Sequence, residues 1–215
     1  LCVEATKSEA FDFYDESLMA VIASHLASLV DYSRLREEAE GRARNLGLIH
    51  EVVQQVIGLT DVHQVAEISA ELLARYFAYE LAAVFIADAQ GVLTIGGFGG
   101  TSQNVVRRAM KSFEYPISGG ITGHVFETGE SLVVNDVSQD SRYRSLHGWQ
   151  AGSEMCVAIR DGAKVLGIID VESRSSNAFT HNDFMALESL AGILASVITS
   201  ADQYQRFQAT IGELR

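Results

Sequence analysis

The hydrophobic positions of the chain change their spacing several times, and each change predicts a different element. Residues 13–43 carry an apolar stripe at steps of three and four, which predicts a long helix. A charged stretch follows, and the stripe then resumes at Leu46, Ile49, Val53 and Val56. These 3-4-3 steps suit the seam of a helical dimer, and they equally suit packing on the core of the domain that follows.

Farther along, the apolar period changes to two in two places, and each place predicts an antiparallel hairpin. Residues 81–87 and 92–98 flank one turn, and residues 155–159 and 164–172 flank another. A short helix is expected over 103–111, an extended piece over 113–117 and a second short helix over 121–128. A long final helix begins at Thr180 or Asn182. Hairpins with helices at both ends predict an α+β domain, in which an antiparallel sheet carries the terminal helices on one face.

The end of the chain repeats its beginning. The matches all lie 168 positions apart, as Val3 does from Val171: Val3-Glu4 with Val171-Glu172, Ala10-Phe11 with Ala178-Phe179, Asp15 with Asp183, and Leu26-Ala27-Ser28 with Leu194-Ala195-Ser196. One offset held across a strand, a loop and a helix predicts a repeated domain. We therefore expect a fragment in three parts. Residues 1–43 are the last strand and helix of a preceding copy, 44–204 a complete copy, and 205–215 the start of a downstream helical connector.

The composition narrows the classes of partner. The formal net charge is −12, and so acidic a surface repels phosphate backbones and anionic lipids, which predicts no nucleic-acid and no membrane contact. No apolar run without charge reaches the length that spans a bilayer. Cys2 and Cys156 form neither a disulfide framework nor a metal-ligand spacing, so we expect no metal site and a cytoplasmic location.

A series of short motifs then appears in a telling order. The chain shows a glycine-initiated short helix at 120–123, the exit Thr128-Gly129-Glu130, Asn135-Asp136-Val137 with Asp140, the strand VLGIIDVES, and the spacing from Phe179 to Asp183. With these motifs the chain strongly resembles a GAF domain over residues 46–204, preceded by the end of another copy. The resemblance implies a six-stranded antiparallel sheet with long terminal helices on one face. On the other face it implies a ligand pocket covered by small helices and loops.

GAF domains are mostly sensory and regulatory modules of signalling proteins, and the pocket cover is where a ligand would be held. The candidate ligand-binding residues are Phe98, His124, Asp136, Tyr143, His147 and Trp149. Tyr143 and Trp149 could stack on a planar ligand, whereas Asp136 and Asp140 are more simply explained as side chains that bond the backbone of their own loop. His124 is either a ligand contact or an ordinary residue of the cover helix.

The same residues argue against the family's known cofactors, and they leave the ligand unnamed. Cys156 lies in an apolar strand, which predicts an inert core thiol, and the Cys-His pair typical of bilin-binding relatives is missing. The cyclic-nucleotide pattern is incomplete, because its Lys is absent and Phe184 stands where its Glu would be. Haem has only the lone His124 to offer as a ligand. We expect no catalytic residue and no enzyme activity.

The resulting hypothesis is a sensory GAF module that binds a small molecule or partner. It relays a change of conformation through its terminal helices to an output domain in cis, such as the histidine kinase of a two-component system or a cyclase. A homodimer is expected through the helix positions Leu46, Ile49, Val53, Val56, Leu190, Leu194, Val197 and Ile198. The alternative is a ligand-free dimerisation spacer, whose pocket is filled by its own side chains at Phe85, Phe98, Phe113 and Met155.

Overall fold

The computed structural model of the protein describes residues 1–6, 8, 10–77, 79–101, 119–145 and 149–213. The chain divides into two compact units, Leu1–Arg44 and Asn45–Arg215. The division falls within helix α1 (Phe13–Val56). The domain boundaries expected from the sequence stay a prediction.

In the first unit, α1 begins with a reciprocal cap. The Asp12 Oδ1 atom accepts hydrogen bonds from the backbone N–H groups of Tyr14 and Asp15, at 2.8 and 3.0 Å. The Asp15 carboxylate accepts in return from the Asp12 N–H at 3.0 Å. Residues 1–6 have no strand assignment. A segment expected to be a strand cannot pair without neighbouring strands, and the first unit supplies none among its described residues.

The second unit is built on an antiparallel sheet of five described strands, in the order β2-β1-β5-β4-β3. Its strands are β1 (Leu81–Ala87), β2 (Leu93–Gly99), β3 (Leu132–Val134), β4 (Ser153–Asp161) and β5 (Lys164–Ser173). Both predicted hairpins are confirmed. Six strands were expected, and the extended piece predicted at 113–117 lies outside the described residues, as does the helix predicted at 103–111.

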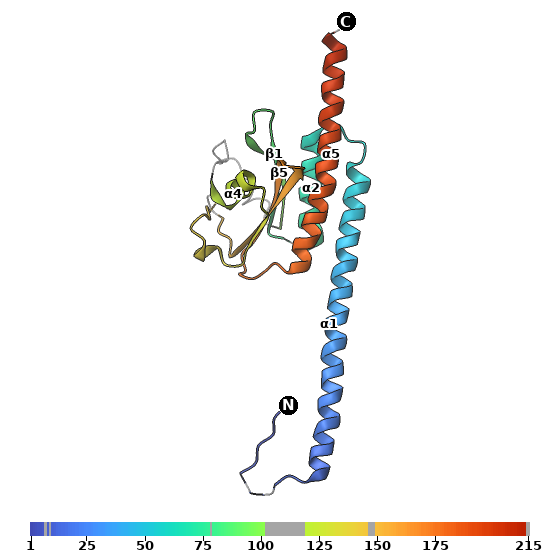
Figure 1. The fold of residues 1–215 in the computed structure, drawn as a ribbon, viewed down its shortest axis with the longest axis vertical. Coiled ribbons are helices and arrows are strands. Elements are labelled where there is room, and N and C mark those ends of the chain that lie inside the picture. Colours follow the sequence, from blue (N-terminus) through green and yellow to red (C-terminus); the bar gives the residue numbers. More distant parts are fainter. Residues whose placement is uncertain (7, 9, 78, 102–118, 146–148, 214–215) are drawn as a thin grey trace. The chain divides into compact units, whose positions relative to one another are not determined.

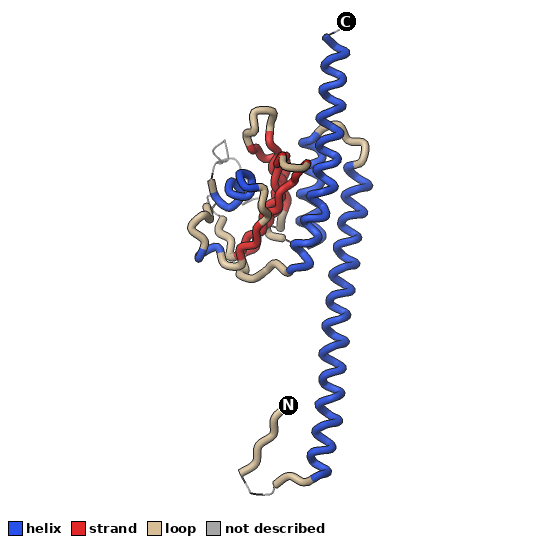
Figure 2. The backbone as a smooth tube through the Cα atoms, in the orientation of Figure 1, coloured by secondary structure: helices blue, strands red, loops and turns tan. Residues whose placement is uncertain are grey.

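Helices cover the two faces of this sheet unequally. Helices α2 (Val62–Phe77) and α5 (His181–Glu213) lie on one face, and the short α4 (Gly120–Thr128) lies on the other (Figures 1 and 2). A turn of 3-10 helix, η1 (Val137–Gln139), follows β3. Gly129 ends α4 in the left-handed conformation, as the sequence predicted, and its N–H donates to the Val125 carbonyl at 2.8 Å. The α+β fold class is confirmed.

The two faces have separate cores, because side chains alternate along each strand. Met155, Val157 and Ile159 of β4 belong to the core under α2 and α5, whereas Cys156 and Ala158 belong to the core under α4. The spacer alternative placed Met155 among the side chains that fill the pocket. Met155 instead lies in the core on the opposite side of the sheet from α4. Phe85 does lie in the α4-side core, while Phe113 is outside the described residues.

Among the described residues, one stretch is long and apolar enough to cross a membrane, namely His181–Gln208 in α5, with a mean hydropathy of 1.6. The sequence analysis had found no such run, because Glu188 interrupts it. The stretch includes Leu187, Leu190 and Leu194, which are fully buried against the domain. This is the pattern of a core helix, so the length and hydropathy of this stretch are only weak evidence for a membrane-spanning helix.

Candidate functional site

The most unusual feature of the second unit is a group of buried carboxyl groups on the α4 side of the sheet. Antiparallel pairing of β4 with β5 sets Glu154 opposite Glu172 and Cys156 opposite Asp170. The three acidic residues are only 4–6% exposed, and Cys156 is fully buried. Because acidic side chains are almost never buried without a reason, these positions are the first candidates for function.

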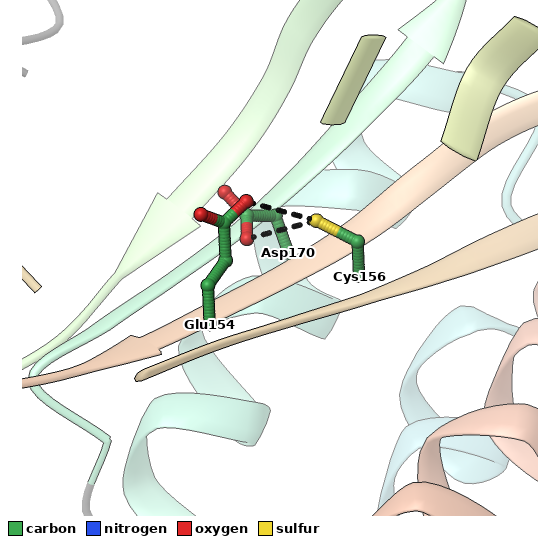
Figure 3. A group of neighbouring side chains, drawn as sticks. All are labelled: Glu154, Cys156 and Asp170. Atoms are coloured by element: carbon green, nitrogen blue, oxygen red, sulfur yellow. Dashed lines mark hydrogen bonds between the residues drawn. The ribbon is translucent and has the colours of Figure 1, made fainter. Parts of the chain in front are cut away.

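Three of these side chains, Glu154, Cys156 and Asp170, interact directly. The Cys156 Sγ atom lies 3.2 Å from Glu154 Oε1 and 3.4 Å from Asp170 Oδ1, as Figure 3 shows. Thr122 of α4 brings its Oγ1 atom to 3.8 Å from the same sulfur. A thiol carries a single proton, so it can donate to only one of these carboxyl groups at a time.

Burial changes the ionisation of the whole group. It raises the pKa of both Glu154 and Glu172 to about 8, with repulsion from Glu172 and Asp170 respectively as the second cause. Burial likewise raises the pKa of Asp170 and that of the Cys156 thiol, with further contributions from the neighbouring carboxylates. Near neutral pH the three carboxyl groups therefore retain protons that they would lose in water.

Two aromatic residues border the acidic group. Trp149 is 2% exposed, and its Nε1–H donates to Glu172 Oε2 at 2.7 Å. The Arg174 guanidinium lies 4.9 Å from the centre of the Trp149 ring. The Tyr143 hydroxyl accepts a hydrogen bond from the Ala151 N–H at 2.8 Å, and burial raises the pKa of Tyr143 to about 12.

Asp136 and Asp140 hold their own loop. Asp136 caps η1, because its Oδ1 accepts from Ser138 N at 3.0 Å and from Ser138 Oγ at 2.7 Å. Asp140 accepts from the Arg142 side chain at 2.9 and 2.6 Å, and this pairing lowers the pKa of Asp140 to about 2. In this structure both aspartates serve the loop, which is the simpler of the two sequence interpretations.

The remaining candidates are distributed over the cover and the sheet. Phe98 and Tyr143 are half-buried against the α4-side core, to which Trp149 itself belongs. His124 is half-buried within α4. His147 lies outside the described residues. The structure thus groups Phe98, Tyr143 and Trp149 on the face that carries the buried carboxyl groups.

The sequence analysis missed Glu154, Asp170 and Glu172, although a signal for them exists. In the segments SEMCVAI and GIIDVES, acidic residues occupy alternate positions of strands that are otherwise apolar. An acidic residue in a strand that is buried on both faces predicts a functional site, because burying an apolar side chain there would cost less free energy.

The same group is compact enough to consider a metal ion. One donor atom each from Glu154, Cys156 and Asp170 lie within 4.8 Å of one another. In this structure the Cys156 Sγ atom lies within hydrogen-bond distance of both carboxyl groups. Buried carboxyl groups that retain protons are poor metal ligands. The sequence prediction of no metal stays a prediction.

The helix positions chosen as a dimer seam fall into two groups. Val56, Leu190, Leu194 and Ile198 are buried in the core under the helices, where α1 contributes the line Leu48, Val52 and Val56. Leu46 is 68% exposed, and Ile49, Val53 and Val197 are half-buried. Val53 and Val197 border an apolar groove that also includes Ile57, Ile193 and Tyr204. The sequence left two interpretations open for these positions, packing within the domain and contact with a second copy. The buried positions pack within the domain, and the exposed and half-buried positions remain available to a partner.

Comparison with known proteins agrees with the fold of the second unit. A family model described as GAF domain matches residues 61–198. Over 102 residues the chain is 26% identical to a probable 3′,5′-cyclic phosphodiesterase, pde-5, of Caenorhabditis elegans, a match that covers 46% of this chain and 14% of that protein. The chain therefore spans only a small part of this curated relative's length.

Solved structures with the same fold come from several functional classes. A GAF domain of a phosphoenolpyruvate-protein phosphotransferase from Coxiella burnetii is 18% identical, with a TM-score of 0.65 over 76% of this chain and 98% of that one. Free methionine-R-sulfoxide reductase from Neisseria meningitidis, solved with its substrate, is 20% identical, with a TM-score of 0.64 over 74% and 91%. At this identity the likeness supports the fold alone. Together with the family match, which covers more than half of the residues, it shows that the chain belongs to the GAF domain family.

Proposed function

We propose that the second unit is a regulatory GAF module that binds a small molecule on the α4 side of its sheet. The observation that carries this proposal is the register pairing of Glu154 with Glu172 and of Cys156 with Asp170. A sheet that serves only as a spacer has no need of three buried carboxyl groups at its centre, because each costs free energy to remove from water. Among the described residues, no acidic side chain is buried on the helix side of the same sheet.

The chemistry of the site favours a ligand rich in hydrogen-bond donors, and above all one with an amino group. Carboxyl oxygens of Glu154, Asp170 and Glu172 accept such bonds, and a cationic ammonium would draw protons off these groups and pair with the charge that remains. The indole of Trp149 and the ring of Tyr143 supply an apolar border. A neighbour with the same fold was solved with its substrate and is named for the free amino acid methionine-R-sulfoxide, which makes free amino acids the first ligands to test.

Binding without turnover is the expected mode. A reductase needs a nucleophilic thiolate, and burial keeps the Cys156 thiol protonated by raising its pKa. Cys2, the other cysteine, belongs to the first compact unit. The module then acts by population shift, since a ligand that binds one arrangement of β4, β5 and α4 better than another changes the balance between them. Helix α5 follows β5 after the short segment 174–180 and is the path to an output domain.

The test is a thermal-shift and calorimetric screen with the free amino acids, their sulfoxides and simple amines. We expect at least one ligand to raise the melting temperature of the 215-residue chain in a concentration-dependent way. The matched variant is Asp170→Asn, which keeps the shape of the side chain and cannot become charged when an ammonium group binds. It is expected to fold, and to bind the same ligand at least 10-fold more weakly, since one charged hydrogen bond is worth roughly 1.5–3 kcal/mol.

A distant substitution serves as the control. Glu127→Gln changes an exposed carboxylate of α4 and is expected to leave ligand binding unchanged. If no donor-rich ligand shifts the melting temperature, or if Asp170→Asn binds as well as the parent, the site is not a ligand site. The dimerisation spacer would then be the better account.

A further inference from the structure

The first unit starts its helix in the same way as the last helix of the second unit. The Asp12 N–H donates to the Asp15 carboxylate, and 168 positions later the Thr180 N–H donates to the Asp183 carboxylate at 2.8 Å. The return bonds also correspond, since Asp15 N donates to Asp12 Oδ1 at 3.0 Å and Asp183 N donates to Thr180 Oγ1 at 3.2 Å. The sequence offset is therefore also a match of local geometry.

The same offset relates the apolar faces of the two helices. From Ala186 to Ile198, the α5 side chains that are buried are Ala186, Leu187, Leu190, Ala191, Leu194, Ala195 and Ile198. Their counterparts in α1 are, in the same order, Leu18, Met19, Ile22, Ala23, Leu26, Ala27 and Val30. Every member of this set is apolar, and the three small or identical positions Ala23, Leu26 and Ala27 are kept unchanged. We call these seven α1 residues the unpaired face.

The unpaired face lacks the cover that its counterpart has. Leu18 and Val30 are 58% and 67% exposed, and Ile22 and Leu26 are 38% and 45% exposed. In α5 the corresponding positions are at most 6% exposed, and what covers them is the antiparallel sheet, mainly β4. An apolar surface of this length, left in water, marks an interaction site.

We propose that residues 1–30 form the last strand and last helix of a second GAF core, and that the unpaired face packs on the antiparallel sheet of that core. The partner surface is thus an apolar sheet face of the kind that β1, β4 and β5 present to α5. Residues 1–6 correspond to the end of β5, which in the complete domain lies between β1 and β4 and is paired on both sides. This explains why the segment has no strand assignment in the first unit.

A sheet fits the unpaired face better than a second copy of the helix would. Leu18, Ile22, Leu26 and Val30 recur at steps of four, beside a second row formed by Met19, Ala23 and Ala27. Two adjacent rows make a broad surface, and the alanines allow close approach to a flat partner. A coiled-coil seam alternates steps of three and four, and continuing it from Ile22, Leu26 and Leu29 would place Ser33 and Arg36 in the interface.

The test is whether the α1 sequence can replace the α5 sequence on the sheet of the second unit. In the full chain, residues 178–204 are replaced by the sequence of residues 10–36, which keeps the 168-residue register. We expect this exchange to unfold cooperatively on heating, with a melting temperature lowered by no more than about 10 °C, because the core volume and pattern are retained. The control inserts residues 11–37 at the same place, which rotates the apolar face by about 100° at nearly unchanged composition, and it is expected to lose cooperative unfolding.

A second variant keeps the test decisive if the exchange disturbs the outer surface of α5. The substitutions A186L, L187M, L190I and I198V transfer only the unpaired face. Cooperative unfolding of the exchange or of this variant, with the slipped control unfolded, supports the proposal. It is overturned if both fail, if the slipped control also folds, or if sedimentation shows that the unaltered chain self-associates and that I22D/L26D abolishes this association.

Discussion

At the scale of single residues, the α4 side of the sheet depends on protons. Glu154 and Glu172 face each other across β4 and β5, and burial raises the pKa of each to about 8, from an ordinary value of 4.5. Between these two pH values the folded state binds more protons than the unfolded state. The free energy of unfolding therefore falls as the pH rises through this window, and the loss is complete above pH 8.

This sign gives a prediction for Glu172→Gln. The variant cannot titrate, so its free energy of unfolding should fall less steeply than that of the parent between pH 5 and pH 8. The slope changes by at most about 1.4 kcal/mol per pH unit for the one proton removed. Urea unfolding at several pH values measures it, with the exposed Glu127→Gln as control. An unchanged slope in Glu172→Gln would contradict the buried protonated carboxyl group.

Trp149 gives a second prediction at the same scale. Trp149→Phe keeps most of the buried ring and removes the N–H that donates to Glu172 Oε2. We expect a loss of about 1–3 kcal/mol in the free energy of unfolding, since a buried acceptor loses its donor. In the Glu172→Gln background the cost of Trp149→Phe should differ, and this double-mutant cycle isolates the pair. Equal costs in both backgrounds would mean that the hydrogen bond contributes nothing.

At the scale of elements, the close contacts between layers decide which residues are allowed. Gly97 of β2 lies against α2 so closely that an added Cβ would come within 2.3 Å of Glu67 Cα and 2.4 Å of Glu67 N. These are backbone atoms, which cannot move without moving the helix. Gly192, by contrast, is an exposed glycine within α5 whose added Cβ would meet nothing within 4 Å.

The two glycines therefore predict opposite effects of the same substitution. Gly97→Ala should lower the free energy of unfolding by about 3 kcal/mol or more, because α2 must shift away from the sheet. Gly192→Ala should raise it by roughly 0.5–1 kcal/mol, since alanine favours the helix. Chemical denaturation of both variants measures this. A mild effect at Gly97 would mean that α2 is not held closely against β2.

The elements were also the level at which the sequence was most informative. Period-two runs placed both hairpins, and Gly129 placed the end of α4, because these signals are local. The buried line of α1 was harder. The sequence indicated Leu46, Ile49, Val53 and Val56, while the fold buries Leu48, Val52 and Val56, because tertiary packing selects which face of the helix is covered. The acidic site was missed because its meaning depends on which strands pair, and pairing joins residues distant in sequence.

At the scale of the whole molecule, the expected homodimer remains a prediction, and the groove beside α5 gives it a test. Ile57 is 66% exposed at the edge of the apolar groove that Val53, Ile193 and Val197 also border. Ile57→Asp should weaken self-association at least 10-fold by placing a charge in an apolar interface, without lowering the melting temperature of the monomer. Sedimentation velocity measures the dissociation constant, with the exposed Gln54→Asp as control. Equal dissociation constants for parent and Ile57→Asp would exclude this groove from the interface.

The junction after β5 has a mechanical consequence. Three hydrogen bonds hold its backbone. Gly152 N donates to Ser173 O at 2.7 Å, and Ser153 Oγ donates to Ser175 O at 2.7 Å. Asn177 N donates to Asn135 O at 2.8 Å. Asn177 is held in the left-handed region, with φ of 56°. These hydrogen bonds hold the segment between two elements. One is the strand that bears Asp170 and Glu172, and the other is α5. If the proposed relay operates, a displacement of that strand along its axis is expected to reach the first turn of α5.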